Sequence, residues 1–540
     1  MVEINPVVHG QMMAIPLTLA SVMRHAERVC PDSRIVSITA DNSRHRYTLR
    51  EAFQRVRRLA NVLHNLGLPS GTRVGTLAWN DHRHLEAYYA ISCSGYVCHT
   101  INPRLFPAQI EYIANHARDR VLLVDPAFVP LVEKLAPELR TVDHFIALTG
   151  DRSVLDGTTL RWLCYEDLLA AASPEFSFPD LDEDAACALA YTSGTTGAPK
   201  GVLYSHRSTV LHTYAVTMPT AFALSPRDVV LAVVPMFHVN AWSLPYAVPA
   251  SGATLVLPGS KMGDAAILAT LINEERVTCA AGVPTVWINL LAYLRTKRLG
   301  VPSLERVIVG GSACSRALLE AFENEHDVDV LHAWGMTEMS PLGTVNTAPR
   351  SADIETRLKQ GKPIFGIELK IIDAHGHELP WDGVTSGYLK VRGPWVCRGY
   401  FQHTDSPAHY EHGWFDTGDV ATIDRDGYLQ ITDRAKDIIK SGGEWISSID
   451  LENAALMHPL VQESAVIGVP HPKWDERPVL YVVSKDGTRV DEGSLRHCLA
   501  RHIADWWLPE TIVQVDTLPH TATGKLDKRA LREQHAAVMK

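Results

Sequence analysis

A stretch rich in glycine and hydroxyl residues, YTSGTTGAPKG at positions 191–201, holds the residue types that bind phosphate. Glycines let backbone N–H groups approach an anion, hydroxyl groups add donors, and Lys200 supplies a positive charge. The stretch lacks the Gly-Lys-Ser/Thr junction of a Walker A loop and the GxSxG pattern of a hydrolase elbow. Taken alone, it fits a phosphate site and a surface loop equally well.

Four more motifs follow in the chain and add carboxylates and cations. They are HAWGMTE at 332–338, GWFDTGD at 413–419, DRAKDIIKSGGEW at 433–445 and TATGKLDKRAL at 521–531. The five motifs in this order resemble the adenylate-forming superfamily of acyl- and aryl-CoA synthetases, luciferases and peptide-synthetase adenylation domains, over essentially the whole chain. The resemblance implies that a carboxylate first reacts with ATP, giving an acyl-adenylate and pyrophosphate, and that coenzyme A then displaces AMP. Charge develops on phosphates in the first step, so cation clamps suit this chemistry.

Two segments carry a closer likeness to the medium- and long-chain fatty acyl-CoA synthetases, VVPMFHVNAW at 233–242 and KSGGEWISSIDLEN at 440–453. Two others, TLAWNDHRHLEAYYA at 76–90 and HTINPRLFP at 99–107, are similar to the 3-methylmercaptopropionyl-CoA ligases. The leading hypothesis is therefore an ATP-dependent ligase for a medium- or long-chain fatty acid. The alternatives are a ligase for the short thioether acid and a non-catalytic acyl-adenylate binder.

The resemblance implies a nucleotide site drawn from all five motifs. Phosphate binding is assigned to Thr192, Ser193, Gly194, Thr195, Thr196, Gly197 and Lys200. The adenine pocket and its continuation are assigned to Gly311, Ser312, Ala313, His332, Ala333, Trp334, Gly335, Met336 and Thr337, with Trp334 in the stacking position. Asp419 and Arg434 match the ribose and phosphate positions, and Lys440 and Trp445 match positions that contact nucleotide or acyl-adenylate.

Three residues are implied to act directly in catalysis. Lys525 would neutralise charge between the α-phosphate and the acyl carboxylate, and Glu338 with Thr192 would hold Mg²⁺, a cation that prefers oxygen ligands. His238 would flank the carboxylate. Because one site must serve two half-reactions, a rotation of the C-terminal domain is implied, with Lys436 at the hinge.

The acyl site is expected around the segment that follows His238. Trp242 is expected to gate this site, and Gly442 and Gly443 would let the pantetheine arm of coenzyme A pass. The predicted wall consists of Val239, Asn240, Trp287, Gly310, Gly335, Met336 and Met339. This apolar and adaptable wall favours an aliphatic or thioether chain.

Alternating helical and β-rich runs indicate the elements that position these residues. RVGTLAW, RVLLVD, VVLAVV, ATLVLPG and RVIVGG predict buried parallel strands of an α/β fold, and Thr48 with Glu51 predicts a capped helix that ends at Gly67. After about residue 380, GYLKVRG and GYLQITD predict a β-rich subdomain. We expect a large domain at 1–433 for ATP and acyl binding, a hinge at 434–436 and a mobile α+β domain at 437–540.

Composition narrows the function further. The 540 residues carry a net charge of -10, which argues against nucleic acid and anionic lipid as general partners. Nine scattered cysteines without a CxxC pair favour a reducing compartment and argue against a disulfide framework or zinc cage. No signal peptide or membrane-spanning run is evident, so we expect a cytoplasmic enzyme without integral membrane association. The resemblance also suggests a homodimer.

Overall fold

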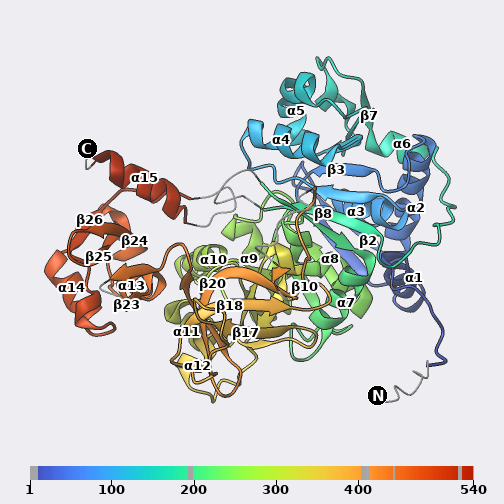
Figure 1. The fold of residues 1–540 in the computed structure, drawn as a ribbon. Coiled ribbons are helices and arrows are strands. Elements are labelled where there is room, and N and C mark those ends of the chain that lie inside the picture. Colours follow the sequence, from blue (N-terminus) through green and yellow to red (C-terminus); the bar gives the residue numbers. More distant parts are fainter. Residues whose placement is uncertain are drawn as a thin grey trace, which may run out of the picture.

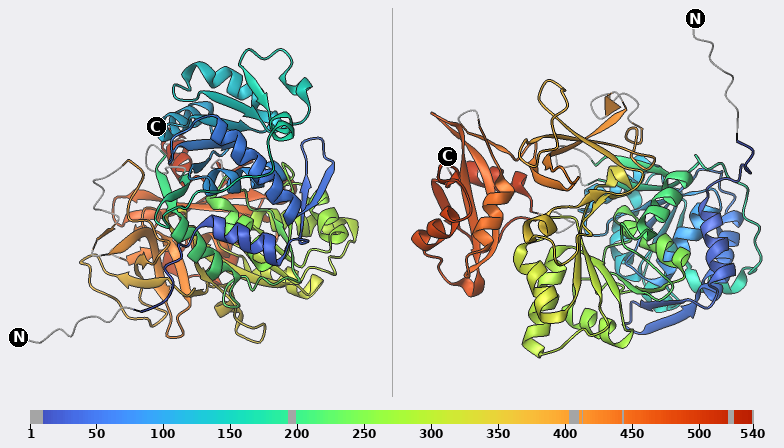
Figure 2. Two further views of the ribbon diagram at one scale, coloured as in Figure 1. Left: turned by 90° about the vertical axis from the view of Figure 1, so that its right-hand side faces the viewer. Right: turned by 90° about the horizontal axis from the view of Figure 1, so that it is seen from below.

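The computed structural model describes residues 10–192, 199–402, 410–411, 413–441, 444–520 and 526–538. Two large sheets with helices packed on them form the body, and a β-rich subdomain follows (Figure 1). A smaller unit, drawn in orange to red, lies to one side of the body in Figure 1 and in the right-hand view of Figure 2. The predicted α/β fold class, with a large N-terminal part and a small C-terminal part, is confirmed.

The seven-stranded sheet contains two of the predicted parallel strands, RVGTLAW and RVLLVD, as β3 and β5. All neighbouring strands in it are parallel except β8 and β9, which form an antiparallel pair. In sheet order the strands are β7 (Trp162–Cys164), β6 (His144–Ala147), β5 (Val121–Val124), β3 (Arg73–Leu77), β4 (Val97–Thr100), β8 (Ala186–Tyr191) and β9 (Gly201–Ser205). Its helices are α2 (Leu49–Asn65), α3 (His82–Cys93), α4 (Pro107–Ala117), α5 (Val129–Leu135) and α6 (Tyr165–Ala171).

The nine-stranded sheet contains the other three predicted strands, which become β10, β11 and β13. Its order is β16 (Lys362–Pro363), β15 (Leu342–Val345), β14 (Asp329–Gly335), β13 (Arg306–Val309), β12 (Cys279–Gly282), β10 (Val229–Ala232), β11 (Thr254–Leu257), β1 (Arg34–Ile38) and β2 (Arg44–Thr48). The strands from β14 to β1 run parallel. The remaining helices of the body are α1 (Leu19–Val29), α7 (His206–Thr217), α8 (Leu244–Ser251), α9 (Ala265–Glu274), α10 (Pro284–Lys297), α11 (Arg316–His326) and α12 (Ile354–Leu358).

The β-rich subdomain and the C-terminal unit have one sheet each. The first consists of β17 (Glu368–Ile372), β18 (Gly387–Arg392), β20 (Trp414–Ile423), β19 (Tyr410–Glu411) and β21 (Leu429–Arg434). The second consists of β23 (Glu444–Ile446), β22 (Ile439–Ser441), β25 (Asp475–Ser484), β24 (Val461–His471) and β26 (Thr511–Gln514), with helices α13 (Ser448–Leu456), α14 (Glu492–Ala500) and α15 (Lys528–Val538). The β21 strand ends where the DRAKD motif begins its turn.

Helix α2 shows how local sequence sets an element boundary. Thr48 accepts a hydrogen bond from the backbone N–H of Glu51, and the Glu51 carboxylate accepts one from the backbone N–H of Thr48. This is the predicted capping box. The chain leaves the helix through Gly67, whose φ of +67° lies in the left-handed region that glycine tolerates.

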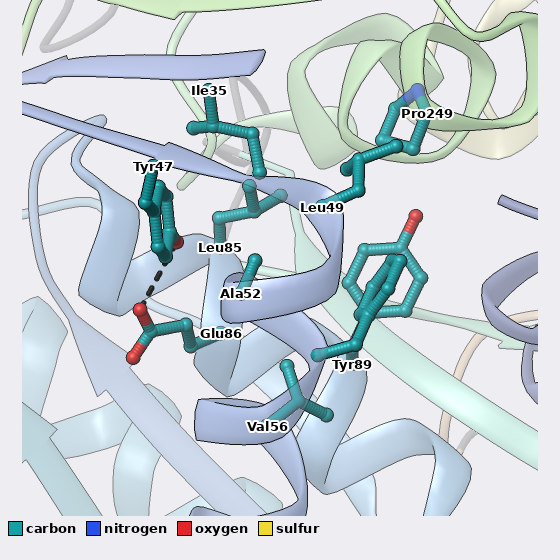
Figure 3. Close-up of a pocket in the computed structure, with 10 residues that line it drawn as sticks. Ile35, Tyr47, Leu49, Ala52, Val56, Leu85, Glu86, Tyr89 and Pro249 are labelled. Carbon is teal, nitrogen blue, oxygen red and sulfur yellow. Dashed lines mark hydrogen bonds between the residues drawn. The ribbon is translucent and has the colours of Figure 1, made fainter. Parts of the chain in front are cut away.

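A small apolar pocket marks the joint between the two large sheets, where β1 and β2 meet α2, α3 and α8 (Figure 3). The one carboxylate in its lining, Glu86, accepts hydrogen bonds from Tyr47 at 3.0 Å, from Arg55 Nε at 2.7 Å and from Tyr165 at 2.6 Å. Such a fully partnered buried carboxylate stabilises the joint and is not available to a ligand.

Within the described residues, no helix combines the length and the apolar character that crossing a membrane requires.

Candidate active site

Three loops that carry predicted site residues lie at one edge of the nine-stranded sheet. Strands β10, β13 and β14 run parallel, so their carboxyl ends meet at the same edge. His238 follows β10, Gly310 follows β13, and the turn with Glu338 follows β14. Ligands of open α/β sheets bind at such carboxyl ends.

The phosphate-binding stretch begins at the end of β8 and returns at the start of β9. Tyr191 pairs with Gly201 across the two strands, and the backbone N–H of Thr192 donates to the carbonyl of Lys200 at 2.9 Å. The hairpin therefore fixes both ends of the stretch. The predicted residues Ser193, Gly194, Thr195, Thr196 and Gly197 lie outside the described residues.

Tyr400 contacts both Lys200 and Glu338, the candidate metal ligand. The Lys200 ammonium group lies 4.8 Å from the centre of the Tyr400 ring, and the Tyr400 hydroxyl donates to Oε1 of Glu338 at 2.9 Å. Burial and the nearby Glu338 charge raise the pKa of Tyr400, so the phenol remains a donor. Sequence reasoning missed Tyr400, because an aromatic residue in the run RGYF carries no signal for this role.

Glu338 is held in a form that suits a hard cation. It lies in a 3-10 turn (Thr337–Met339), and its side chain is buried. The turn is fixed because Cys397 N–H donates to the Glu338 carbonyl at 2.8 Å and the Tyr204 hydroxyl donates to the Thr337 carbonyl at 2.7 Å. The hydrogen bond from Tyr400 engages Oε1 of the Glu338 carboxylate. No cluster of three or more His, Cys, Asp or Glu side chains that could hold a metal ion occurs in the described part of the chain.

Asp419, Arg434 and Trp334 form a second cluster. Asp419 and Arg434 face each other on β20 and β21, and Nε of Arg434 lies 2.9 Å from Oδ1 of Asp419. The indole N–H of Trp334 donates to Oδ2 of Asp419 at 3.1 Å. The aspartate is only 2% exposed, so these two contacts orient both of its oxygens. Each oxygen keeps further acceptor capacity for a hydroxyl pair of a ribose.

The predicted adenine residues divide into a buried group and an accessible group. His332 donates from Nδ1 to the carbonyl of Leu358 at 2.8 Å, and Nε2 accepts from the backbone N–H of Cys314 at 3.3 Å. Burial lowers the pKa of His332 to about 4, so the ring is neutral and both nitrogens are used by the protein. Ala333 is also buried, whereas Gly311 and Ser312 are exposed and Ala313 is partly exposed on the loop after β13.

The turn after β14 requires its glycine. A methyl group on Gly335 would overlap the carbonyl oxygen of Pro341, and Met336 N–H donates to that same oxygen at 3.0 Å. The close backbone approach brings Thr337 and Glu338 back toward β15. Met339, a predicted wall residue, is fully buried behind the turn.

The segment after His238 forms a left-handed turn (Val239–Ser243). Its five residues have φ between +45° and +67°, and none is glycine. This conformation costs about 1–2 kcal/mol per residue, so tertiary contacts must hold it. The turn places Trp242 against the loop after β13, since a methyl group on Gly310 would lie 2.9 Å from Cη2 of Trp242 and 3.2 Å from the carbonyl of Ala333.

Asn80 holds the backbone that leads into this turn. Its amide nitrogen donates to the carbonyls of Ala232 and Val234 at 3.0 and 2.8 Å, and its oxygen accepts from Met236 N–H at 2.7 Å. Asn80 follows β3, so it ties the seven-stranded sheet to the segment before His238. Sequence reasoning missed this residue; its position directly after a predicted strand was the only available signal.

Other predicted residues have different surroundings. Trp287 is a core residue of the α9–α10 layer, fully buried, and its indole N–H donates to the carbonyl of Gly282 at 3.2 Å. Val239 and Asn240 are buried in the left-handed turn, and no hydrogen-bond partner is found for Oδ1 of Asn240 within the described residues.

Only some of the predicted site residues of the C-terminal part belong to the described residues. Lys525, Gly442 and Gly443 lie outside the described residues. Lys436 and Lys440 are exposed, and Trp445 packs on Tyr388 of β18 with ring centres 5.6 Å apart. Tyr388 pairs with Val420, and the side chains of Val420 and Asp419 point to opposite faces of β20. The structure thus does not bring Trp445 and Asp419 together.

Comparisons with known proteins show the family to which the chain belongs. The family model of AMP-binding enzymes matches residues 22–401, and the model of the AMP-binding enzyme C-terminal domain matches residues 450–525. The chain is 50% identical over 538 residues to a 3-methylmercaptopropionyl-CoA ligase of Ruegeria pomeroyi, covering 98% of this chain and 99% of that protein. It is 46% identical to a medium-chain-fatty-acid–CoA ligase of Ectopseudomonas oleovorans, covering 98% of both chains.

A solved structure shows the same architecture. The anthranilate CoA ligase AuaEII in complex with anthranoyl-AMP superimposes with a TM-score of 0.87 at 26% sequence identity, covering 98% of this chain and 99% of that chain. The chain belongs to the family of AMP-binding enzymes and is an AMP-forming acid–CoA ligase.

Proposed function

We propose that this ligase activates a medium- or long-chain fatty acid with ATP and transfers the acyl group to coenzyme A. The observation that carries the proposal is the position of β14 and the turn after it. Ala333 lies beside Gly310 and Trp242, Trp334 binds Asp419, and Glu338 binds Tyr400 below Lys200. One short segment therefore joins the acyl, ribose and phosphate parts of the proposed site.

Each part has a distinct task in the proposed reaction. Lys200, with the loop before it, binds the β- and γ-phosphates, and Asp419 with Arg434 binds the ribose. His238 flanks the carboxylate, and Lys525 neutralises charge as the carboxylate oxygen attacks the α-phosphorus and pyrophosphate leaves. A magnesium ion held by Glu338 and Thr192 would supply positive charge to the phosphates.

The acid is proposed from the wall after His238. Val239, Trp242, Gly310 and Met339 present no charged group, which suits an aliphatic chain. A second candidate is 3-methylmercaptopropionate, favoured by the 50% identity to a ligase named for that acid.

Pyrophosphate release over a ladder of acids distinguishes these candidates. We expect the highest kcat/KM between octanoate and palmitate in a series that starts at propionate and includes 3-methylmercaptopropionate. A maximum at the thioether acid would favour the second candidate. No carboxylate-dependent release with any member of the series would contradict the proposed substrate class.

The remaining proposals concern organisation. We divide the chain into the ATP- and acyl-binding domain at 1–433, the hinge at 434–436 and the mobile domain at 437–540. A Lys436→Pro variant should then slow thioester formation more than adenylation.

Nine free cysteines support a cytoplasmic setting. The exposed side chains of Met12, Met13 and Ile15 support a homodimer, which sedimentation would test.

A further inference from the structure

A buried ion pair lies three residues after the proposed catalytic lysine. Nζ of Lys528, the first residue of α15, is 2.8 Å from Oε1 of Glu452 and donates to Oγ of Ser448 at 2.5 Å. Both charged side chains are only 12% exposed. Burial disfavours the ammonium ion, but the charges of Glu452, Asp433 and Asp437 outweigh this and raise the pKa of Lys528. Lys528 is therefore a cation, held at the beginning of α13.

The same cluster continues across the proposed hinge. Asp433 lies on β21 and pairs with Val420 of β20, so it belongs to the large domain. Its Oδ2 accepts a hydrogen bond from the backbone N–H of Ser448 at 2.6 Å, and the hydroxyl of Ser447 donates to the carbonyl of Thr432 at 2.5 Å. Residues 447 and 448 follow the hinge in the chain. A rotation at Lys436 must therefore break these contacts.

The residues that flank the segment with Lys525 lead directly into this cluster. Asp527 N–H donates to the carbonyl of Pro519 at 2.8 Å, and a β-bridge joins His520 to Leu526, so the described residues before and after this segment contact each other. The Asp527 carboxylate also accepts a hydrogen bond from the backbone N–H of Ala530, directly before α15 begins at Lys528. Because Lys528 follows directly, its pairing with α13 sets where these flanking residues lie.

From these contacts we infer that Asp433, Ser448, Glu452 and Lys528 form a cross-hinge latch that holds the C-terminal domain in the pose used for adenylation. The inference rests on the proposed function, in which Lys525 acts in the first half-reaction. Trp445 lies on the sheet face opposite Asp419, so this side chain is turned away from the proposed ribose site. Lys528 is thus a positioning residue, and the latch must open before thioester formation.

The two half-reactions provide the first test. Lys528→Met keeps the length of the side chain and removes its charge, which leaves two carboxylates without their counter-ion. We expect single-turnover pyrophosphate release to slow about tenfold or more. Thioester formation from supplied acyl-adenylate and coenzyme A should be unchanged or faster, because loss of the latch shifts the population toward the other pose. Lys528→Arg should restore adenylation, and Lys473→Met, an exposed lysine of the same domain, should change neither rate.

Proteolysis tests the latch without relying on activity. Lys436 is exposed in the hinge, so trypsin can cut there when the segment opens. We expect cleavage after Lys436 to be several-fold faster in Lys528→Met and in Asp433→Asn than in the wild type or Lys473→Met. Asp433→Asn leaves the Lys528–Glu452 pair intact and therefore serves if Lys528→Met does not fold.

The experiments distinguish a failure of the latch from a failure of the proposed function. If both half-reactions slow equally and hinge cleavage is unchanged, Lys528 has only a structural role and the inference is wrong. If wild-type protein releases no pyrophosphate with any acid, the proposed function fails, but the rate of hinge cleavage still decides whether the latch exists.

Discussion

Replacing Tyr400 by phenylalanine removes the hydroxyl group that binds Glu338 and leaves the aromatic ring beneath Lys200. The variant thus separates two contacts made by one side chain, the 2.9 Å hydrogen bond and the cation–π contact at 4.8 Å. If the hydrogen bond orients Glu338 toward the metal, adenylation should slow while Lys200 keeps its place. ATP binding without the acid should change little.

The size of the effect follows from the burial of Glu338, which is 7% exposed. A hydrogen bond to a charged group contributes about 1.5–3 kcal/mol, and its loss leaves Oε1 buried without a donor. At about 1.4 kcal/mol per tenfold, the expected decrease in kcat for pyrophosphate release is roughly 10- to 100-fold. Tyr204→Phe is the matched control, since it removes a neutral hydrogen bond of about 1 kcal/mol from the adjacent Thr337 carbonyl.

The assay is carboxylate-dependent pyrophosphate release with Mg²⁺ titrated at saturating ATP. Tyr400→Phe should need more Mg²⁺ for half-maximal rate, whereas Tyr204→Phe should not. A Tyr400→Phe enzyme within twofold of the wild type in kcat, with the same Mg²⁺ dependence, would refute the assigned role of the Tyr400 hydroxyl.

Three further predictions concern the proposed catalytic lysine, Asn80 and the stability of the fold at acidic pH. Lys525→Ala should abolish pyrophosphate release while calorimetry still detects ATP binding, because the lysine acts mainly in the transition state; near-normal release would disprove its role. Asn80→Ala should lower the free energy of unfolding by about 3 kcal/mol through three lost hydrogen bonds and raise KM for the acid; an unchanged KM would contradict the positioning role. Burial lowers the folded-state pKa of several histidines below the ordinary 6.5, to about 4 for His84, His206 and His332 and to about 3 for His212. The unfolded chain therefore takes up protons first, and the free energy of unfolding should fall as pH drops from 6.5 toward 4, by at most roughly 3 kcal/mol for a histidine with a folded pKa near 4. Urea unfolding between pH 7.5 and 4.5 measures this, and a flat profile would argue against the neutral buried forms of His84, His206, His212 and His332.

Much of the fold was predictable because the helix ends and buried strands depend on residues that are close together in the sequence. The capping box of α2 requires only Thr48 and Glu51 at the right spacing, and the apolar β-rich runs can bury themselves only as inner strands. The predicted parallel pairing of these strands is confirmed. Which strands become neighbours was not readable, because that depends on contacts between segments far apart in sequence.

The site residues also fall into those that a local motif identifies and those whose role depends on distant parts of the chain. Motifs nominated Glu338 and Asp419, since a carboxylate in a dense motif is conspicuous. Sequence reasoning missed Tyr400 and Asn80 because their roles depend on three-dimensional neighbours. These are a carboxylate 62 positions away for Tyr400 and three backbone groups at the end of β10 and just after it for Asn80. His332 looked like a nucleotide contact in its motif, yet both ring nitrogens bind backbone groups.

The left-handed turn at Val239–Ser243 has a consequence for changing substrate preference. Its backbone is unfavourable for five non-glycine residues, so its shape depends on Asn80 before it and on α8 after it. Substitutions at or beside Asn80 would therefore alter the wall of the acyl site, although Asn80 is not part of that wall. Directed evolution for a new chain length should recover variants near Asn80 as often as variants in the wall itself.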